Sequence, residues 1–167
     1  MNPPIIERFT MRTSFVIAAI AFCTAGVPAF AATTPDFTGT WLQNNAHSSV
    51  AAGAPAYSNK IAQHEGTLEV TTIIAASGDR KETMRVRSYA IGGKPETSTD
   101  KDGDEFTSSV KWQEAVLVFE TVEAEKAGTI TTRETWTMAA DGKSFTKNRH
   151  SSSLRGESDR AYVLEKQ

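Results

Sequence analysis

The strongest constraint on this fold is an alternation of apolar and polar side chains with a period of two residues. It is clearest at residues 68–74, 106–112 and 130–138. A period of two places alternate side chains on opposite faces of an extended strand, whereas a helix needs a period near 3.6. The same segments are rich in β-branched and aromatic residues, which suit a pleated, half-buried surface. The chain is therefore expected to be all-β.

Turn-forming residues separate these runs at regular intervals. Glycine, often after Asp or Ser, recurs at residues 66, 78, 92–93, 103, 128, 142 and 156, and Gln113-Glu114 marks a further tight turn. Most spacings are close to the 8–12 residues typical of all-β sandwiches and barrels. The predicted strands are 38–43, 58–65, 67–75, 82–91, 104–113, 115–123, 129–139, 144–151 and 158–166, with 94–99 as a further candidate.

These strands predict an antiparallel up-and-down barrel of about eight to ten strands. Closing the meander into a barrel removes exposed strand edges, and a two-sheet sandwich is the alternative. Residues 43–56 are small and polar, so they are expected to form a long loop or a short helix.

Residues 1–31 have the three-part layout of a secretory signal peptide. Arg8 and Arg12 precede an uncharged apolar run at 15–25, and Ala29-Phe30-Ala31 supplies the small-x-small cleavage pattern. The run is shorter than the roughly 20 residues that span a bilayer, so no stable membrane span is expected after cleavage. Met11 is an alternative start. We expect one domain at 32–167, located in the periplasm or outside a bacterial cell.

Removal of this leader would also change the composition. Cys23 is the only cysteine and lies within the leader, so 136 residues without a thiol would remain. A disulfide, a cysteine metal site and cysteine catalysis are thereby excluded for that domain. The domain would have 16 basic and 19 acidic residues, a net charge of -3. This balance gives no electrostatic case for binding nucleic acid.

The two ends of the predicted domain carry short motifs. Gly39-Thr40-Trp41 lies on the first predicted strand, and Arg160-Ala161-Tyr162 lies on the last. A glycine there lets the chain turn closely into a barrel, and the indole can plug its closed end. The first motif resembles the start of the calycin barrels, which are the lipocalins and the fatty-acid-binding proteins. The second resembles the Arg-x-Tyr pair that holds a ligand carboxylate in fatty-acid-binding proteins.

This resemblance implies a lipocalin-like barrel. It also implies that Arg160 packs across Trp41, as a late arginine does in lipocalins. A wider pattern resembles a group of uncharacterised exported bacterial proteins, which implies the same barrel but supplies no activity. The pattern comprises residues 36–42, 111–112, 117–118, 136, 141–143 and 164–167.

Sites for metals and catalysis are not recognisable in the sequence. The acidic run at 100–105 has acids at positions 1, 3 and 5 of a calcium loop, but Glu105 and Lys111 occupy positions that need glycine and glutamate. It is better explained as a hairpin turn. His47, His64 and His150 lack the spacing of a zinc motif. No nucleophile elbow or phosphate-binding glycine loop occurs. We predict no metal, no cofactor and no catalytic residue.

Two strands carry charged residues whose face the sequence leaves open. Glu134 lies in an otherwise inward-facing row, and Arg85, Arg87, Arg149 and Arg160 are its candidate partners. The row is a polar interior that orients a ligand, an internal ion pair that closes one end of the barrel, or a row that faces outward after all. Arg85, Arg87 and Tyr89 share one face of a strand. Met84 and Val86 on the opposite face favour an outward position for them.

We predict that the barrel binds a small apolar or amphipathic molecule without catalysis. The predicted lining residues are Trp41, Trp112, Glu134, Trp136, Arg160 and Tyr162. Small polar residues at inward positions, Thr72, Ser108 and Thr132, favour a cavity. The alternatives are a structural or protein-interaction barrel with a filled interior and, third, an enzyme built around Glu134 and an arginine. The sequence determines neither the ligand nor the oligomeric state.

Overall fold

A computed structural model describes residues 34–51, 53–99, 103–125 and 128–167. The described residues form ten strands and one short 3-10 helix. The elements are β1 (Gly39–Gln43), η1 (Asn45–His47), β2 (Tyr57–His64), β3 (Thr67–Ile74), β4 (Thr83–Ala90), β5 (Glu96–Thr99), β6 (Glu105–Gln113), β7 (Val116–Glu125), β8 (Gly128–Met138), β9 (Ser144–Ser153) and β10 (Gly156–Lys166).

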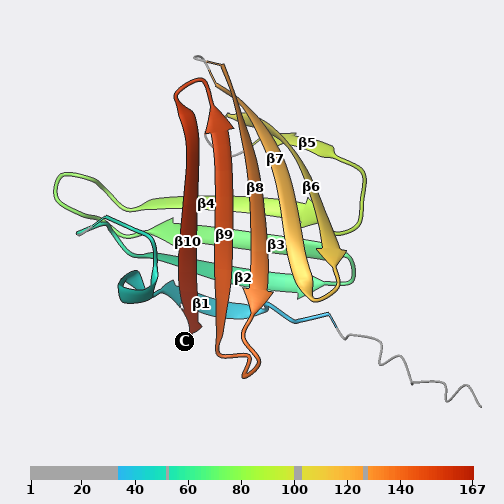
Figure 1. The fold of residues 1–167 in the computed structure, drawn as a ribbon, viewed down its shortest axis with the longest axis horizontal. Coiled ribbons are helices and arrows are strands. Elements are labelled where there is room, and N and C mark those ends of the chain that lie inside the picture. Colours follow the sequence, from blue (N-terminus) through green and yellow to red (C-terminus); the bar gives the residue numbers. More distant parts are fainter. Residues whose placement is uncertain (1–33, 52, 100–102, 126–127) are drawn as a thin grey trace, which may run out of the picture. The chain divides into compact units, whose positions relative to one another are not determined.

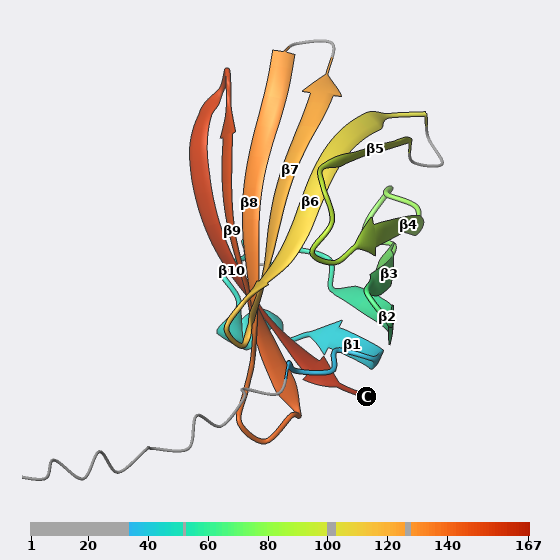
Figure 2. The same ribbon diagram turned by 90° about the vertical axis from the view of Figure 1, so that its right-hand side faces the viewer.

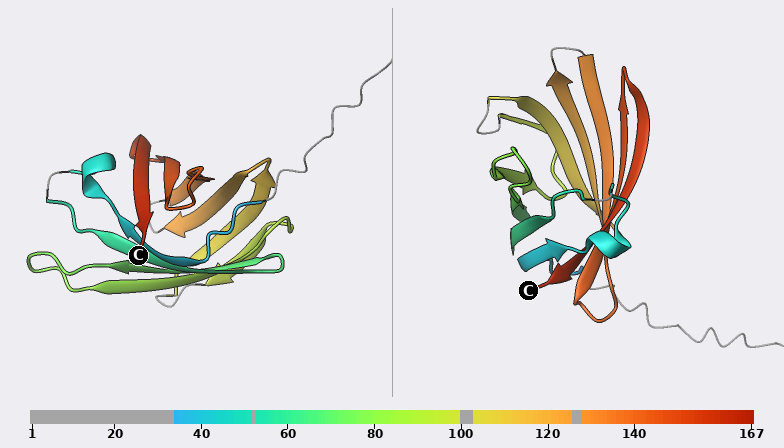
Figure 3. Two further views of the ribbon diagram at one scale, coloured as in Figure 1. Left: turned by 90° about the horizontal axis from the view of Figure 1, so that it is seen from below. Right: turned by 90° about the vertical axis from the view of Figure 1, so that its left-hand side faces the viewer.

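All ten strands belong to one antiparallel sheet with the order β4-β3-β2-β1-β10-β9-β8-β7-β6-β5. Each strand pairs with the next one in the sequence, except that β4 does not pair with β5. The first and last strands, β1 and β10, also pair with each other. Strands β1–β4 form one layer, and β6–β10 cross it as a second layer (Figures 1 and 2). Figure 3 shows the same two layers from two further sides.

The sheet curves into a nearly closed barrel, and the opening lies between β4 and β5. A short bridge between Ile91 and Val110 narrows it, with the Gly92 amide donating to the Val110 carbonyl at 2.6 Å. Side chains close more of it, because the Arg87 guanidinium of β4 lies 2.7 Å from the Glu123 carboxylate of β7. The edge strand β5 has only four residues, which limits pairing with other chains on that side.

Tight turns allow this meander because their residues adopt positive φ angles. The predicted turn glycines include Gly66 (φ 76°) and Gly142 (φ 66°). At the β6–β7 turn, Glu114 has φ 55°, a left-handed conformation that costs a side-chain-bearing residue roughly 1 kcal/mol.

One end of the barrel is closed by aromatic side chains. Phe37, just before β1, is fully buried and packs edge-on against Trp136 at 5.4 Å and Phe145 at 5.1 Å between ring centroids. Trp41 is also fully buried, packs edge-on against Phe145 at 4.8 Å, and donates its indole N–H to the Phe37 carbonyl at 2.8 Å. Burial of such rings contributes a large part of the hydrophobic stabilisation.

The predicted fold class is confirmed: the protein is all-β, with ten antiparallel up-and-down strands in a nearly closed barrel. The candidate strand at 94–99 exists as β5, and residues 43–56 form η1 and a loop. The predicted signal peptide lies outside the described residues, so the division at residue 31 stays a prediction. Among the described residues, no helix has the length and apolar character that crossing a bilayer requires.

Candidate ligand-binding cavity

A cavity of about 760 Å³ lies between the two layers and opens to solvent. Its walls come from β2, β3 and β4 on one side and from β7–β10 on the other, with residues 49–51 and 54–55 at its rim. Side chains that point inward alternate with outward ones along each strand, so a regular meander lines the cavity without any special motif. This volume is in the range of small-molecule sites in proteins.

The floor of the cavity is aromatic. Trp136 is 2 % exposed and Phe119 is 4 % exposed, and their rings lie 4.6 Å apart. Tyr57 of β2 packs edge-on against Tyr162 of β10 at 5.6 Å. These rings provide apolar contact area, and the tyrosines add hydroxyl groups that can donate a hydrogen bond.

An ion pair lies beside this floor. The Lys147 ammonium of β9 is 3.2 Å from the Glu134 carboxylate of β8, which also accepts a hydrogen bond from the Trp136 indole N–H. The ammonium lies 4.8 Å from the centre of the Trp136 ring and 5.6 Å from that of Tyr57. Burial, followed by the nearby Glu134 carboxylate, raises the pKa of Tyr57 well above its ordinary value, so this hydroxyl stays protonated.

A second ion pair lies at the opening between β4 and β5. Arg87 bonds Glu123 and stacks on the Phe106 ring, with 4.1 Å between guanidinium carbon and ring centroid. Tyr89 is the next inward-facing residue of β4, and its ring packs against that of Phe119 with 5.3 Å between the ring centroids. Burial raises the pKa of Tyr89, and the Arg87 charge partly offsets this rise.

The outward position favoured for Arg87 and Tyr89 is therefore wrong. The opposite face of β4, with Met84 and Val86, is the exposed one, at 48 % and 41 %. Alternation identified the two faces of β4. It did not show which face was inside. Arg87 can be buried because it pairs with Glu123, which is 36 residues away in the sequence.

The third group of charges has no acidic partner. Arg149 of β9 and Arg160 of β10 are directly opposite each other in the antiparallel register, and both line the cavity. Neither forms an ion pair with a described carboxylate. The Arg149 Nε atom is buried and, among the described residues, has no hydrogen-bond partner. Two like charges directly opposite on neighbouring strands destabilise a sheet.

The predicted lining residues separate into two groups. Glu134, Trp136, Arg160 and Tyr162 line the cavity together. Trp41 and Trp112 lie instead at the aromatic closed end, where Trp112 stacks on Phe37 at 6.1 Å between ring centroids. Trp41 is fully buried in the aromatic core, and Trp112 is partly buried against it. None of the six is tested as a ligand contact, so that role stays a prediction.

Two predicted contacts are corrected. The cation over Trp41 is Lys166, at 5.3 Å from the ring, rather than Arg160. The register explains this, because Trp41 pairs with Lys166 while Arg160 lies six residues earlier on β10. The partner of Glu134 is Lys147, which was not among the four candidate arginines. Lys147 alternates with Phe145 and Arg149 on β9, so this inward position could have been found from the sequence.

The small polar residues predicted to face inward also divide. Thr72 and Thr132 line the cavity, and each hydroxyl meets a neighbour: Thr72 donates to Asn59 at 2.9 Å, and Thr132 lies 3.2 Å from the Ser151 hydroxyl. Ser108 is buried at 7 % exposure in β6.

Metal ligands are not gathered anywhere in the part of the chain that the structure describes. His150 and Asp159 form an exposed pair at 2.8 Å on the outer face of β9 and β10. Residues 100–102 of the acidic run lie outside the described residues. The remaining acids, Asp104 and Glu105, lie at the start of β6, next to β5.

Comparison with known proteins identifies the class of fold. No protein-family model matches the chain, and no curated protein matches it. Solved structures do: zebrafish ileal bile acid-binding protein with cholic acid has a TM-score of 0.53 and 12% identity, covering 78% of this chain and 98% of that one. Apo lipid binding protein 8 of Caenorhabditis elegans has a TM-score of 0.57 and 11% identity, covering 78% and 95%.

A secretory abundant heat soluble protein of Ramazzottius varieornatus has a TM-score of 0.57 and 9% identity, covering 82% of this chain and 99% of that one. At such identities the likeness concerns the fold alone. These neighbours are barrels of the lipocalin and fatty-acid-binding type, and this chain shares their fold, as the resemblance of its two ends implied.

Proposed function

We propose that this protein binds a small apolar or amphipathic molecule in the cavity, without catalysis. The observation that carries the proposal is the cavity of about 760 Å³, which joins an aromatic floor to charged walls. An apolar chain would contact Trp136 and Phe119, while a polar end would meet Arg160 and Tyr162. The zebrafish neighbour was solved with cholic acid, and the nematode neighbour is a lipid binding protein, which supports the same assignment.

The filled-interior alternative has less support. A barrel of this size can be plugged by its own side chains, but here small residues such as Thr72 and Thr132 face the cavity from opposite layers. Phe37, Trp112 and Phe145, which do not line the cavity, pack together at the closed end.

Location remains part of the proposal. The signal-peptide pattern at residues 1–31 supports binding outside the cytoplasm, after cleavage. N-terminal sequencing of protein recovered from the envelope of a bacterial expression host tests it. A mature N-terminus at Ala32 is the expected result, and an intact leader on soluble cytoplasmic protein would contradict it.

Binding can be tested with a cavity-filling variant and its neighbour. Thr132 faces the cavity at 8 % exposure, whereas Thr131 is exposed on the outer face of the same strand. The parent protein is titrated with dodecanoate, and binding is measured by tryptophan fluorescence and by calorimetry. Saturable binding is the expected result. Thr132→Phe should weaken it at least tenfold, and Thr131→Phe should leave it unchanged. Equal affinities for the two folded variants would show that the ligand does not enter this cavity.

A further inference from the structure

The inner face of the β9–β10 ribbon becomes steadily more polar from the closed end to its tip. Cross-strand pairs run from Phe145 and Leu164, through Lys147 and Tyr162, to Arg149 and Arg160. Beyond them Ser151 is opposite Ser158, and Ser153 is opposite Gly156. The upper ends of β7–β10 extend past β4 and its layer (Figure 2).

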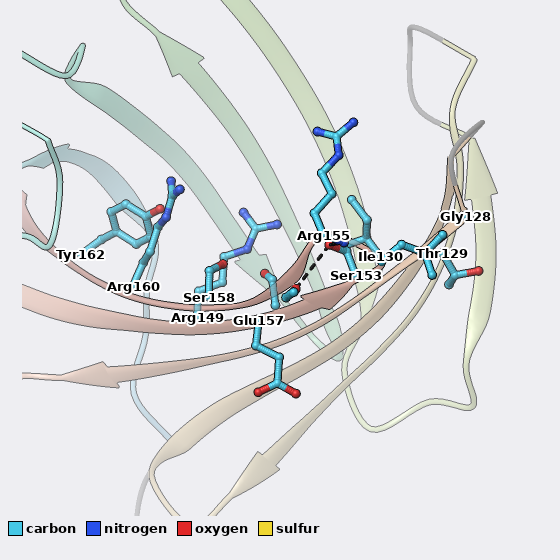
Figure 4. Close-up of a pocket in the computed structure, with 13 residues that line it drawn as sticks. Gly128, Thr129, Ile130, Arg149, Ser153, Arg155, Glu157, Ser158, Arg160 and Tyr162 are labelled. Carbon is cyan, nitrogen blue, oxygen red and sulfur yellow. Dashed lines mark hydrogen bonds between the residues drawn. The ribbon is translucent and has the colours of Figure 1, made fainter.

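This polar face is hollowed into a groove of about 490 Å³ that continues into the cavity through Arg149, Arg160 and Tyr162. Figure 4 shows the side chains of Arg149, Arg155 and Arg160 extending to the same side of the ribbon, with Glu157 extending to the opposite side. None of the three guanidinium groups forms an ion pair with a described carboxylate.

The charge of the site contrasts with that of the chain. The whole chain has a net charge of -2. The cavity walls nevertheless carry six basic and two acidic side chains: Arg80, Arg85, Arg87, Lys147, Arg149, Arg160, Glu123 and Glu134. Both acids are already paired, with Arg87 and Lys147. Arg149 lies opposite Glu134 in the β8–β9 register, but that carboxylate contacts Lys147, so neither Arg149 nor Arg160 forms an ion pair with a wall carboxylate.

We propose that the groove binds the phosphate or sulfate head of an amphiphile whose apolar tail occupies the cavity. This inference rests on the proposed function and names the ligand class. A carboxylate carries one negative charge and neutralises one guanidinium charge, whereas a phosphate monoester offers three oxygens and close to two negative charges at neutral pH. Arg149 and Arg160 can each form bidentate hydrogen bonds with such a group. Its negative charge then offsets the repulsion between the two guanidinium groups.

The hydroxyl groups around the arginines support the same head group. Tyr162 lies next to Arg160 on the inner face, and the Ser151 and Ser158 hydroxyls lie one pair further toward the tip. Hydroxyls donate to phosphate oxygens that the guanidiniums leave free. Arg155 at the ribbon tip adds a third positive charge, which lines the groove but not the cavity. Arg155 and Arg160 are both exposed, so the attraction of each for an anion is sensitive to salt.

The test compares probes with one tail and different heads. The protein is titrated at pH 7.5 with dodecyl phosphate, dodecanoate or inorganic phosphate. The two amphiphiles are kept below their micelle-forming concentrations, and at this pH a phosphate monoester is mostly dianionic. Dodecyl phosphate should bind at least tenfold more tightly than dodecanoate. Arg149→Gln and Arg160→Gln should each reduce this preference at least tenfold, and Arg155→Gln should reduce it a fewfold. Arg133→Gln, on the outer face of β8 and paired with Glu120, is the matched control and should change nothing.

The outcomes separate the two proposals. Equal affinity for dodecyl phosphate and dodecanoate would overturn the phosphate assignment and leave the proposed function standing. The same would follow if Arg133→Gln weakened binding as much as Arg149→Gln, because the preference would then reflect general surface charge. If inorganic phosphate bound as tightly as dodecyl phosphate, the oxyanion site would stand but the tail would not use the cavity. Failure of all three probes to bind would overturn both.

Discussion

Removing the charge of Glu134 provides a quantitative test of how the cavity floor is stabilised. In Glu134→Gln the side chain keeps its shape, and its amide oxygen can still accept the Trp136 indole N–H. The change deprives Lys147, 3.2 Å away, of its countercharge. The side chains of Lys147 and Glu134 are only 10% and 16% exposed, so water cannot readily replace the lost partner.

The expected cost follows from these contacts. Breaking a buried ion pair by removing one partner costs roughly 3–5 kcal/mol. The faces of Trp136 and Tyr57 continue to stabilise the ammonium by roughly 1 kcal/mol. The net loss in free energy of unfolding is therefore about 2–4 kcal/mol, which lowers Tm by roughly 6–16 °C for a domain of this size.

Urea denaturation monitored by tryptophan fluorescence measures this loss directly. The midpoint should fall by roughly 1–2 M with little change in the slope m. Lys147→Met added to Glu134→Gln should recover roughly 2 kcal/mol, because the unpaired buried charge is then gone. A loss below about 0.5 kcal/mol in Glu134→Gln, or strict additivity in the double variant, would refute the argument that the pair is coupled in a dry environment.

Two further substitutions test the closed end and the tyrosine beside the ion pair. Phe37→Ala removes a fully buried ring and should cost roughly 3–5 kcal/mol in thermal unfolding. The folded-state pKa of Tyr57 is raised, so the native state retains a proton that the unfolded chain releases above its ordinary pKa near 10.0. Stability should consequently fall as pH rises from about 9.5 to 11.5, and Tyr57→Phe should lose less over this range.

Each of these has a control. Leu42→Ala changes an apolar residue that is 41 % exposed, so its effect should stay within about 0.5 kcal/mol. A Phe37→Ala loss as small as that of Leu42→Ala would show that the aromatic plug contributes little. For Tyr57, identical alkaline slopes in the parent and Tyr57→Phe would show that other groups cause the loss.

The strand pattern was accessible from the sequence because it depends on local rules. Alternation in segments such as 130–138 identified the faces of each strand, and glycines such as Gly66 and Gly142 marked the turns through their positive φ. Motifs at the two ends, Gly39-x-Trp41 and Arg160-x-Tyr162, indicated the class of barrel. Four of the six predicted lining residues, Glu134, Trp136, Arg160 and Tyr162, line one cavity.

Ion-pair partners and the inner face of β4 required the tertiary structure. Glu134 lies opposite Arg149 in the β8–β9 register, yet its carboxylate pairs with Lys147, the next inward residue of β9, at 3.2 Å. Arg87 faces inward because Glu123, from β7, lies behind the opening between β4 and β5. Choosing one partner among several like charges depends on distances of a few ångströms between distant segments, and the Coulomb energy varies steeply over that range.

The all-β class, the approximate bounds of the strands and the residue types available to line a cavity follow from the sequence alone. The packing of Trp41 and Trp112 at the closed end, the position of Lys166 over Trp41, and the juxtaposition of Arg149 and Arg160 depend on the tertiary structure. Strand and turn preferences depend on residues that are close in the sequence, so they can be recognised from the sequence. The register of the strands, the closure of the barrel and the pairing of charges depend on contacts between residues far apart in the sequence. Trp41 of β1 and Lys166 of β10, for example, are paired across 125 residues.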